Sequence, residues 1–173
     1  MKKSLSLILS LTIISAVCAC VLAYVNGLTK DAIAQMMITK TTDAAKAVMP
    51  SGVTQVEQTE KYFIGKNAAG EILGYAVRGS DSGGYGGDVV LMVGFQADKK
   101  TLVCYKTLAA AETPGLGMKL NTPEFANQFA GQDGTALKVK KDGGTIDAIT
   151  AATITSRAVC RAIANAAGAL GGE

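Results

Sequence analysis

The sequence predicts an α+β protein with one N-terminal transmembrane helix, followed by a single domain with a twisted, mainly antiparallel sheet and flanking helices. Residues 4–25 contain no charged side chain, and short strand-like runs and helical stretches follow without strict alternation. Regular alternation would instead indicate a doubly wound parallel sheet. The length of 173 residues suits one domain with an appendage. We expect an anchor over 1–26, a linking helix over 27–50 and a domain over 51–173.

The run from Ser4 to Val25 is long enough to cross a membrane, because about 20 apolar helical residues span the hydrocarbon core. Lys2 and Lys3 precede this run, whereas the charges that follow it, Lys30 and Asp31, cancel. The positive-inside rule therefore predicts a single pass through the cytoplasmic membrane, with the N-terminus in the cytoplasm and the domain on the outer side.

Two other interpretations of this segment stay open. A cleaved signal peptide has a shorter apolar core and a small-residue exit, and this exit is poor here. A lipoprotein site at Cys20 matches only weakly. Mass spectrometry of the N-terminus would separate these interpretations from an uncleaved anchor.

Hydrophobic spacing and turn residues predict the remaining elements. A helix over 28–49 ends at Pro50. The strand-like runs are 61–64, 72–77, 89–95 and 101–108, of which the last two form a hairpin through 97–100. We expect a second helix to begin at Thr122-Pro123, with Thr122 as N-cap and with Phe125 and Phe129 on one face.

Two further strands are expected over 136–139 and 146–149, and a final helix over 155–167. Thr155 or Ser156 would cap that helix, and Gly168 would end it. Cys104 and Cys160 either form a disulfide or remain buried free thiols.

Composition limits the chemistry. The chain has no His, which removes the usual general base, the serine-hydrolase triad and most zinc sites. The net charge is only +3 and includes Lys2 and Lys3, so nucleic-acid binding is not indicated. If the protein carries out chemistry near neutral pH, we therefore expect the reactive group to belong to a cofactor and not to a side chain.

Three loops carry more special residues than a plain turn needs. They are Gly83–Gly87 (the glycine loop), Glu112–Lys119 and Asp147–Ser156. The first allows unusual backbone angles and close approach of a ligand, and the second presents Leu116 between two glycines. The third crowds four hydroxyls at a helix N-terminus, where a phosphate is favoured. Flexible turns, a Leu116 folded into the core and simple N-capping are the corresponding structural explanations.

The run Asp147-x-x-Thr150-Ala151-Ala152-Thr153 resembles the D-x-x-[S/T]-G-A-T flavinylation signature of the FMN-binding domain family. Residues 84–87 and 112–117 resemble two other hallmarks of that family, in the same order. The family includes the G subunit of the Rnf ion-translocating oxidoreductase and the C subunit of the sodium-pumping NADH:quinone oxidoreductase. The family usually has Gly where this chain has Ala151, and we expect modification to survive this small change.

The resemblance implies covalent FMN, attached by a phosphoester to Thr153 by a flavin transferase that uses FAD. Leu116 and the Gly86-Gly87 backbone would flank the ring, while Glu112 and Thr113 would hydrogen-bond its polar edges. Lys119 would neutralise charge, and Asp147 would serve recognition by the transferase. The other expected cofactor-binding residues are Tyr85, Gly115, Gly117, Thr150, Ala151, Ala152, Thr155 and Ser156.

By resemblance, the protein is an electron-transfer subunit, with no complete reaction alone, of a membrane-bound Rnf-type translocase. Such a complex couples electron flow between ferredoxin and NAD to Na⁺ or H⁺ transport, so its other membrane subunits are the expected partners. The alternatives are the C subunit of the sodium-pumping enzyme, a free-standing extracytoplasmic flavoprotein, and a non-redox anchored binding module.

Overall fold

A computed structural model describes residues 2–171, with side chains from Ser6 onward. The chain divides into two compact units between Lys40 and Thr41. Helix α1 (Lys2–Val48) runs through both, so its first part belongs to the N-terminal unit and its last turns to the domain.

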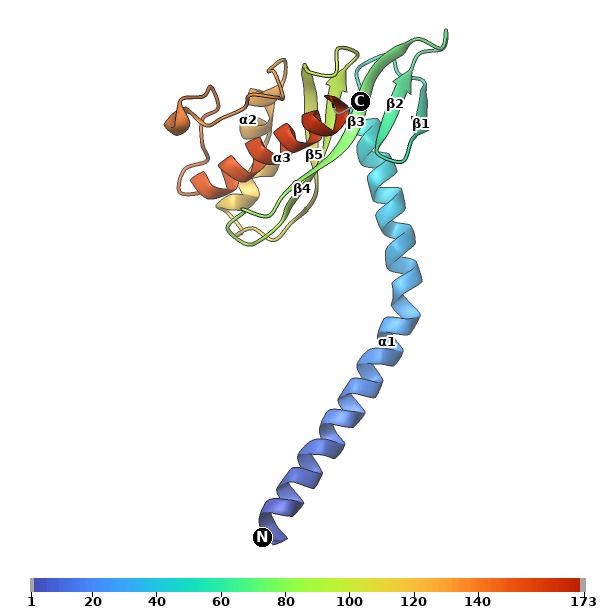
Figure 1. Ribbon diagram of the computed structural model, residues 1–173, viewed down its shortest axis with the longest axis vertical. Coiled ribbons are helices and arrows are strands. Elements are labelled where there is room, and N and C mark those ends of the chain that lie inside the picture. Colours follow the sequence, from blue (N-terminus) through green and yellow to red (C-terminus); the bar gives the residue numbers. More distant parts are fainter. Residues whose placement is uncertain (1, 172–173) are drawn as a thin grey trace. The chain divides into compact units, whose positions relative to one another are not determined.

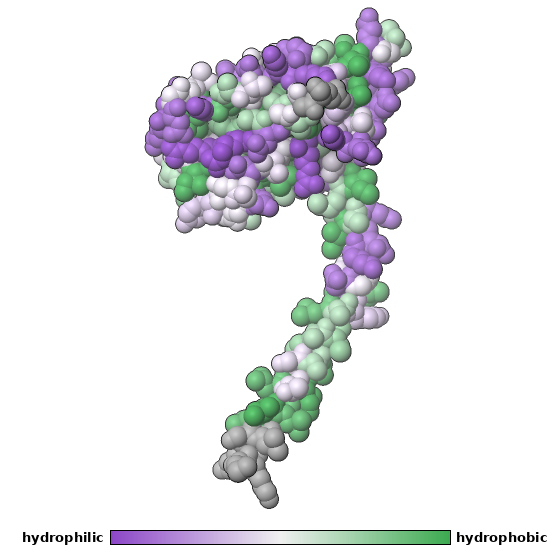
Figure 2. Space-filling view, in the orientation of Figure 1, coloured by the Kyte–Doolittle hydropathy of each residue, from purple (hydrophilic) through white to green (hydrophobic). Residues whose placement is uncertain are grey.

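The described part of the N-terminal unit is helical from Lys2 onward, and its surface is largely apolar. Its large apolar side chains are exposed from Leu7 to Ile38, and Figure 2 shows them along α1. Asn26-Gly27 does not interrupt the helix, where the sequence suggested a division into two segments. The 47 residues of α1 extend for about 70 Å, more than the ~30 Å core of a bilayer. This helix is long and apolar enough to cross a membrane over part of its length.

The domain is built on a five-stranded, fully antiparallel sheet in the order β1-β2-β3-β4-β5, drawn in Figure 1. The strands are β1 (Gln55–Gln58), β2 (Tyr62–Lys66), β3 (Ile72–Asp81), β4 (Val89–Gln96) and β5 (Leu102–Ala110). The four strands expected from the sequence and the β4–β5 hairpin are confirmed. Strand β1 escaped prediction because its residues are polar and mostly exposed at the sheet edge.

Both faces of the sheet are covered, so β4 is buried along nearly its whole length. Alternate β4 residues, including Leu91 and Phe95, join the larger core under α3. On the opposite face Met92 packs with the last turn of α1, around Ala45 and Val48. The period of two that governs strands therefore divides β4 between two cores.

Short helices follow the sheet: η1 (Gly117–Asn121), α2 (Pro123–Ala126) and η2 (Asn127–Phe129). Pro123 lies in the first turn of α2, as expected, and the rings of Phe125 and Phe129 meet edge to face at 5.3 Å. Thr122 occupies the N-cap position, as expected, but its side chain does not cap the helix. Its hydroxyl donates to the Lys119 carbonyl instead.

The strands expected over 136–139 and 146–149 are absent. Only one parallel bridge, Val139 to Ile146, joins these segments, and the 3₁₀ turn η3 (Lys140–Asp142) lies between them. Each segment buries a few apolar residues in the core, but neither extends the sheet. The apolar residues of these segments therefore indicate burial in the core and not strand pairing.

The final helix, α3 (Thr153–Gly171), lies across one face of the sheet, packed mainly on β3 (Figure 1). It begins earlier than expected and continues past Gly168. Thr155 and Ser156 therefore lie inside its first turn and do not cap it. Instead the Ser156 hydroxyl accepts the N–H of Ile149 at 2.9 Å and donates to the carbonyl of Ala152.

The cysteines of the domain are free thiols. Cys160 belongs to the core under α3, whereas Cys104 packs against the α1 side of the sheet. Because the two side chains lie on opposite faces, the geometry excludes the disulfide and agrees with the free-thiol alternative. Burial raises the pKa of the Cys160 thiol to about 11, so it stays protonated near neutral pH.

Candidate functional site

The three loops singled out in the sequence converge on one cavity of about 470 Å³. The glycine loop contributes its tyrosine, the second loop supplies one wall, and the start of α3 supplies the other. The lining residues are Tyr85, Glu112, Thr113, Leu116, Gly117, Ala151, Ala152, Thr153, Ile154 and Thr155. Segments far apart in the chain thus form a single candidate site.

The rim of this cavity is apolar and exposed. Among the described large apolar side chains of residues 41–171, those exposed are Ile72, Tyr85, Leu116 and Ile154. All but Ile72 line the cavity, and the Tyr85 side chain is 72% exposed. An apolar rim of this kind suits a flat, partly apolar ligand, since exposed apolar clusters commonly mark binding sites. Ile154 was not among the residues expected from the sequence to bind the cofactor. Its position next to Thr153 could have indicated that it lines the site.

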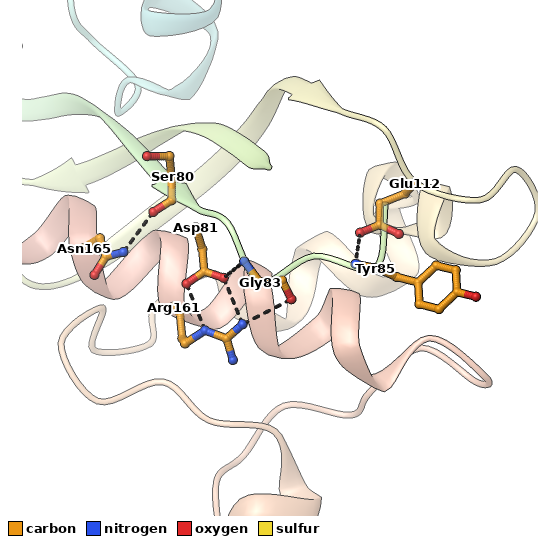
Figure 3. Close-up of polar contacts among 7 residues, drawn as sticks. All are labelled: Ser80, Asp81, Gly83, Tyr85, Glu112, Arg161 and Asn165. Atoms are coloured by element: carbon orange, nitrogen blue, oxygen red, sulfur yellow. Dashed lines mark hydrogen bonds and ion pairs between the residues drawn. The ribbon is translucent and has the colours of Figure 1, made fainter. Parts of the chain in front are cut away.

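Glu112 joins the first two loops below this rim. It is only 6% exposed, and its Oε1 accepts the backbone N–H of Tyr85 at 2.9 Å (Figure 3). The loops must approach closely for this bond to form. A Cβ on Gly86 would lie 1.7 Å from the carbonyl oxygen of Ala111, so only glycine fits there. The glycine loop is therefore held against the second loop by a buried carboxylate, and its tyrosine side chain extends into the cavity.

The floor of the cavity contains polar oxygens without partners. Glu112 Oε2 and Thr155 Oγ1 are both buried without a hydrogen bond, and Thr155 is only 1% exposed. Both lie within 3 Å of the point that a Cβ on Gly117 would occupy, at 2.5 and 2.9 Å. Leaving such atoms unpaired is costly in a folded protein. The arrangement indicates a ligand that offers N–H or O–H donors to this floor.

Thr153 is the first residue of α3 and is half-buried at the cavity wall. The first N–H groups of a helix lack intrahelical partners, and the helix dipole favours negative charge there. The Lys141 ammonium also lies 3.5 Å from Thr153 Oγ1. An anionic group attached to this hydroxyl would therefore be stabilised.

The residue two positions earlier is strained. Ala151 has a backbone φ of +61°, in the left-handed region that favours glycine. This is the position at which the resembling family usually has glycine. In the structure the side chain is exposed, and the cost lies in the backbone instead.

Some of the expected site residues lie elsewhere. Lys119, Asp147 and Thr150 line a neighbouring cavity of about 160 Å³, where loop 147–152 forms part of the wall. Ser156 is buried and bonded to the loop backbone. Gly86, Gly87 and Gly115 shape the two glycine-containing loops without lining the larger cavity, and Gly115 has a φ of +75°, as its turn requires.

Ion pairs surround the site. Lys140 contacts Asp147 at 2.7 Å, and Arg157 forms a two-bond pair with Asp142, also at 2.7 Å. The Arg157 hydrogen bonds lower the pKa of the Asp142 carboxyl. No group of three or more His, Cys, Asp or Glu side chains within the described part of the chain could hold a metal ion.

Comparison with known proteins agrees with this geometry. The FMN-binding domain family matches residues 84–168, a range that contains every residue lining the cavity. The G subunit of the ion-translocating oxidoreductase complex of Methanosarcina acetivorans is 31% identical over 176 residues, covering 95% of this chain and 93% of that protein. This chain belongs to the family of these G subunits.

Other relatives support the same assignment. The G subunit of the Na⁺-translocating ferredoxin:NAD⁺ oxidoreductase complex of Acetobacterium woodii is 32% identical, covering 87% of this chain and 84% of that protein. Among solved structures, the C subunit of Na⁺-translocating NADH-quinone reductase from Parabacteroides distasonis aligns with a TM-score of 0.51 at 27% identity. That alignment covers 62% of this chain and 59% of the reductase protein. NqrC of Shewanella oneidensis, at 19% identity and a TM-score of 0.50, shares the fold, with 65% of this chain and 64% of that chain aligned.

FMN fits the cavity of this G-subunit family member. An isoalloxazine ring is flat and suits the apolar rim, and its ring N–H or ribityl hydroxyls would satisfy the orphan oxygens of Glu112 and Thr155. A phosphate at Thr153 would meet the helix N-terminus and Lys141.

Proposed function

We propose that this protein is an electron-transfer subunit of a membrane-bound, Rnf-type ion-translocating oxidoreductase and that it carries FMN. The observation that supports this most strongly is the single cavity formed by all three loops within the matched FMN-binding region. The membrane helix and the similarity to G subunits across nearly the whole chain agree with it. The FMN would supply the electron-carrying chemistry that the side chains of this chain lack.

We further propose that a flavin transferase attaches the FMN to Thr153 from FAD. The Thr153 hydroxyl would form the phosphoester with the FMN phosphate as the pyrophosphate bond of FAD breaks, and AMP would leave. Thr153 is half-buried at the cavity wall and has Lys141 at 3.5 Å, so the added negative charge would be neutralised where it forms. Outside the cytoplasm a dissociable flavin would be diluted away, and a covalent bond prevents that loss.

The chain's own residues would orient the ring and exclude water. Tyr85, Leu116 and Ile154 would cover its apolar surface, while Glu112 and Thr155 would accept hydrogen bonds from its donors. Asp147 lies in the neighbouring cavity and would serve recognition by the transferase. The other members of the complex would donate and accept the electrons.

Substitution of Thr153 by Val tests the attachment. The full-length variant, co-expressed with a flavin transferase, should lose the covalent increment of FMN less one water in its intact mass, and its in-gel flavin fluorescence. Thr145→Val is the matched control, because Thr145 is an exposed threonine that lies outside the 147–153 motif and lines neither cavity, so it should keep the increment. An increment on Thr153→Val would refute the attachment site. A wild-type protein without flavin would refute the electron-transfer function.

The related C subunit of sodium-pumping quinone reductases shares this fold, so the same role in such an assembly is the second candidate. Affinity purification from mild detergent distinguishes the two assemblies. Co-purifying iron–sulfur proteins active with ferredoxin would support the Rnf-type complex, whereas quinone reductase components would support the alternative.

We also propose that the domain lies on the outer side of the cytoplasmic membrane. The cationic N-terminal residues Lys2 and Lys3 support this orientation. A C-terminal reporter enzyme that folds only outside the cytoplasm should be active when fused to the chain. An inactive fusion, with an active cytoplasmic reporter at the same position, would reverse the assigned orientation.

A further inference from the structure

The glycine loop is attached at two points, and the second of them lies outside the cavity. Arg161 of α3 donates from Nε and Nη2 to the two carboxylate oxygens of Asp81, at 2.9 and 2.8 Å (Figure 3). Asp81 Oδ1 also accepts the backbone N–H of Gly83 at 2.8 Å, and Arg161 Nη2 donates to the Gly83 carbonyl at 3.3 Å. We name these three residues the Asp81–Arg161 clamp.

The clamp leaves no space for a side chain at the start of the loop. A Cβ on Gly83 would lie 2.4 Å from Arg161 Nη2 and 2.9 Å from Asp81 Oδ1. The Asp81 side chain is only 14% exposed, so water competes little for its oxygens. A two-bond arginine–carboxylate pair also fixes orientation better than a single contact does.

The helix that carries the clamp also carries the proposed attachment residue. Arg161 follows Thr153 by two turns, about 12 Å along α3. The same helix therefore sets Thr153 on one wall and, through Gly83, the loop that presents Tyr85 on the other. Asn165, one turn further, donates to the Ser80 carbonyl at 2.8 Å and holds the end of β3 to the helix as well (Figure 3).

We propose that Asp81 and Arg161 are positioning residues, which hold the glycine loop against α3 and so fix Tyr85 against the flavin. Glu112 holds the loop at Tyr85, and the clamp holds it at Gly83. Loss of the clamp frees one end of the loop and loosens the wall that Tyr85 forms. The flavin part of this proposal rests on the proposed FMN at Thr153, whereas the loop part does not.

The test compares Arg161→Gln and Asp81→Asn with a matched control, Arg157→Gln, in the full-length protein in detergent. Arg157 lies on the same helix, one turn from Thr153, and forms the same kind of pair with Asp142, but it does not touch the loop. Arg157→Gln removes the same positive charge as Arg161→Gln does, and it does so nearer to Thr153. Any purely electrostatic effect on the flavin should therefore be at least as large in the control.

The first measurement is amide hydrogen exchange in the glycine loop of protein made without transferase. Exchange at Gly83 and Tyr85 should be roughly tenfold faster in both clamp variants, as expected when a charge-assisted hydrogen bond is lost, and unchanged in Arg157→Gln. Arg161→Lys keeps the charge and should recover part of the protection. Unchanged exchange in the clamp variants would overturn the proposal.

The second measurement uses flavin-loaded protein and records flavin fluorescence anisotropy and midpoint potential. Both should change in the clamp variants, less in Arg161→Lys and least in Arg157→Gln. Equal changes in Arg157→Gln, or none in Arg161→Gln, would refute positioning of the flavin. If Arg161→Gln does not fold, Asp81→Asn and Arg161→Lys provide the same comparison. A wild-type protein without flavin would refute the proposed function, while loop exchange would still decide the clamp.

Discussion

Replacing Ala151 by Gly should stabilise this protein, although the residue lies in an exposed loop. Ala151 has a φ of +61°, a conformation that costs an L-residue about 1–2 kcal/mol. Glycine adopts it freely but loses about 0.4–1 kcal/mol through the greater entropy of its unfolded chain. The net expected gain is about 0.5–1 kcal/mol.

Thermal unfolding of the full-length, unmodified protein in detergent measures this gain. For a domain of this size it corresponds to a rise in Tm of about 2–5 °C. Lys99→Gly is the matched control, because Lys99 has the same φ of 61° but lies in the β4–β5 turn, away from the cavity. Both variants should relieve the same backbone strain, but Lys99→Gly also loses the contact of the Lys99 ammonium with the Tyr75 ring, 5.4 Å from its centroid, so its net gain should be smaller.

The two variants should differ in flavin attachment. Ala151 lines the cavity two residues before Thr153, so relaxing its backbone should change the rate of modification by the transferase, whereas Lys99→Gly should not. If Lys99→Gly gains stability and Ala151→Gly loses it, the strain argument is wrong for this loop. The contacts that the Ala151 methyl makes would then contribute more to stability than relief of the backbone strain does.

Three further outcomes are expected. Gly117→Ala should lower the free energy of unfolding by about 1–3 kcal/mol in chemical denaturation, because its methyl would lie 2.5 Å from Glu112 Oε2; an unchanged midpoint would contradict this packing. Phe129→Ala should cost about 3–5 kcal/mol by the same assay, since it empties the centre of an aromatic cluster, and a loss below 1 kcal/mol would argue against that core. The hydrogen bond from Arg161 lowers the pKa of the Asp81 carboxyl below its usual 3.8. The stability that this ion pair adds to the folded state is therefore present above that pH and is lost as the pH falls through the lower pKa of the folded state. The stability difference between wild type and Asp81→Asn should thus shrink below about pH 4, and a difference that stays constant down to pH 2 would refute this linkage.

The sequence predicted the central sheet well because its strands have simple patterns. The run over 89–95 is continuously apolar, and the structure buries it on both faces. Strand β1 has no such pattern, since it is an exposed polar edge whose pairing depends on β2. The expectation for segments 136–139 and 146–149 was wrong for the opposite reason: they are apolar because they are buried in the core, and only a single bridge joins them.

The candidate site was predictable to the level of its loops. Composition marked all three loops, yet no sequence pattern could divide Asp147, Thr150 and Lys119 from the residues of the larger cavity. That division depends on how loop 147–152 folds. The pairing of Asp81 with Arg161 was equally invisible, because 80 positions separate the two residues in the chain.

The last turns of α1 determine where a soluble fragment of this protein can begin. Ala45 and Val48 pack on Met92, and a Cβ on Gly94 would lie 1.9 Å from the Val48 carbonyl oxygen, so helix and sheet touch without a gap. A fragment starting at residue 41 retains this cover. One starting at residue 51 would expose an apolar sheet surface to water and should aggregate, so crystallisation or titration of the isolated domain needs the longer fragment.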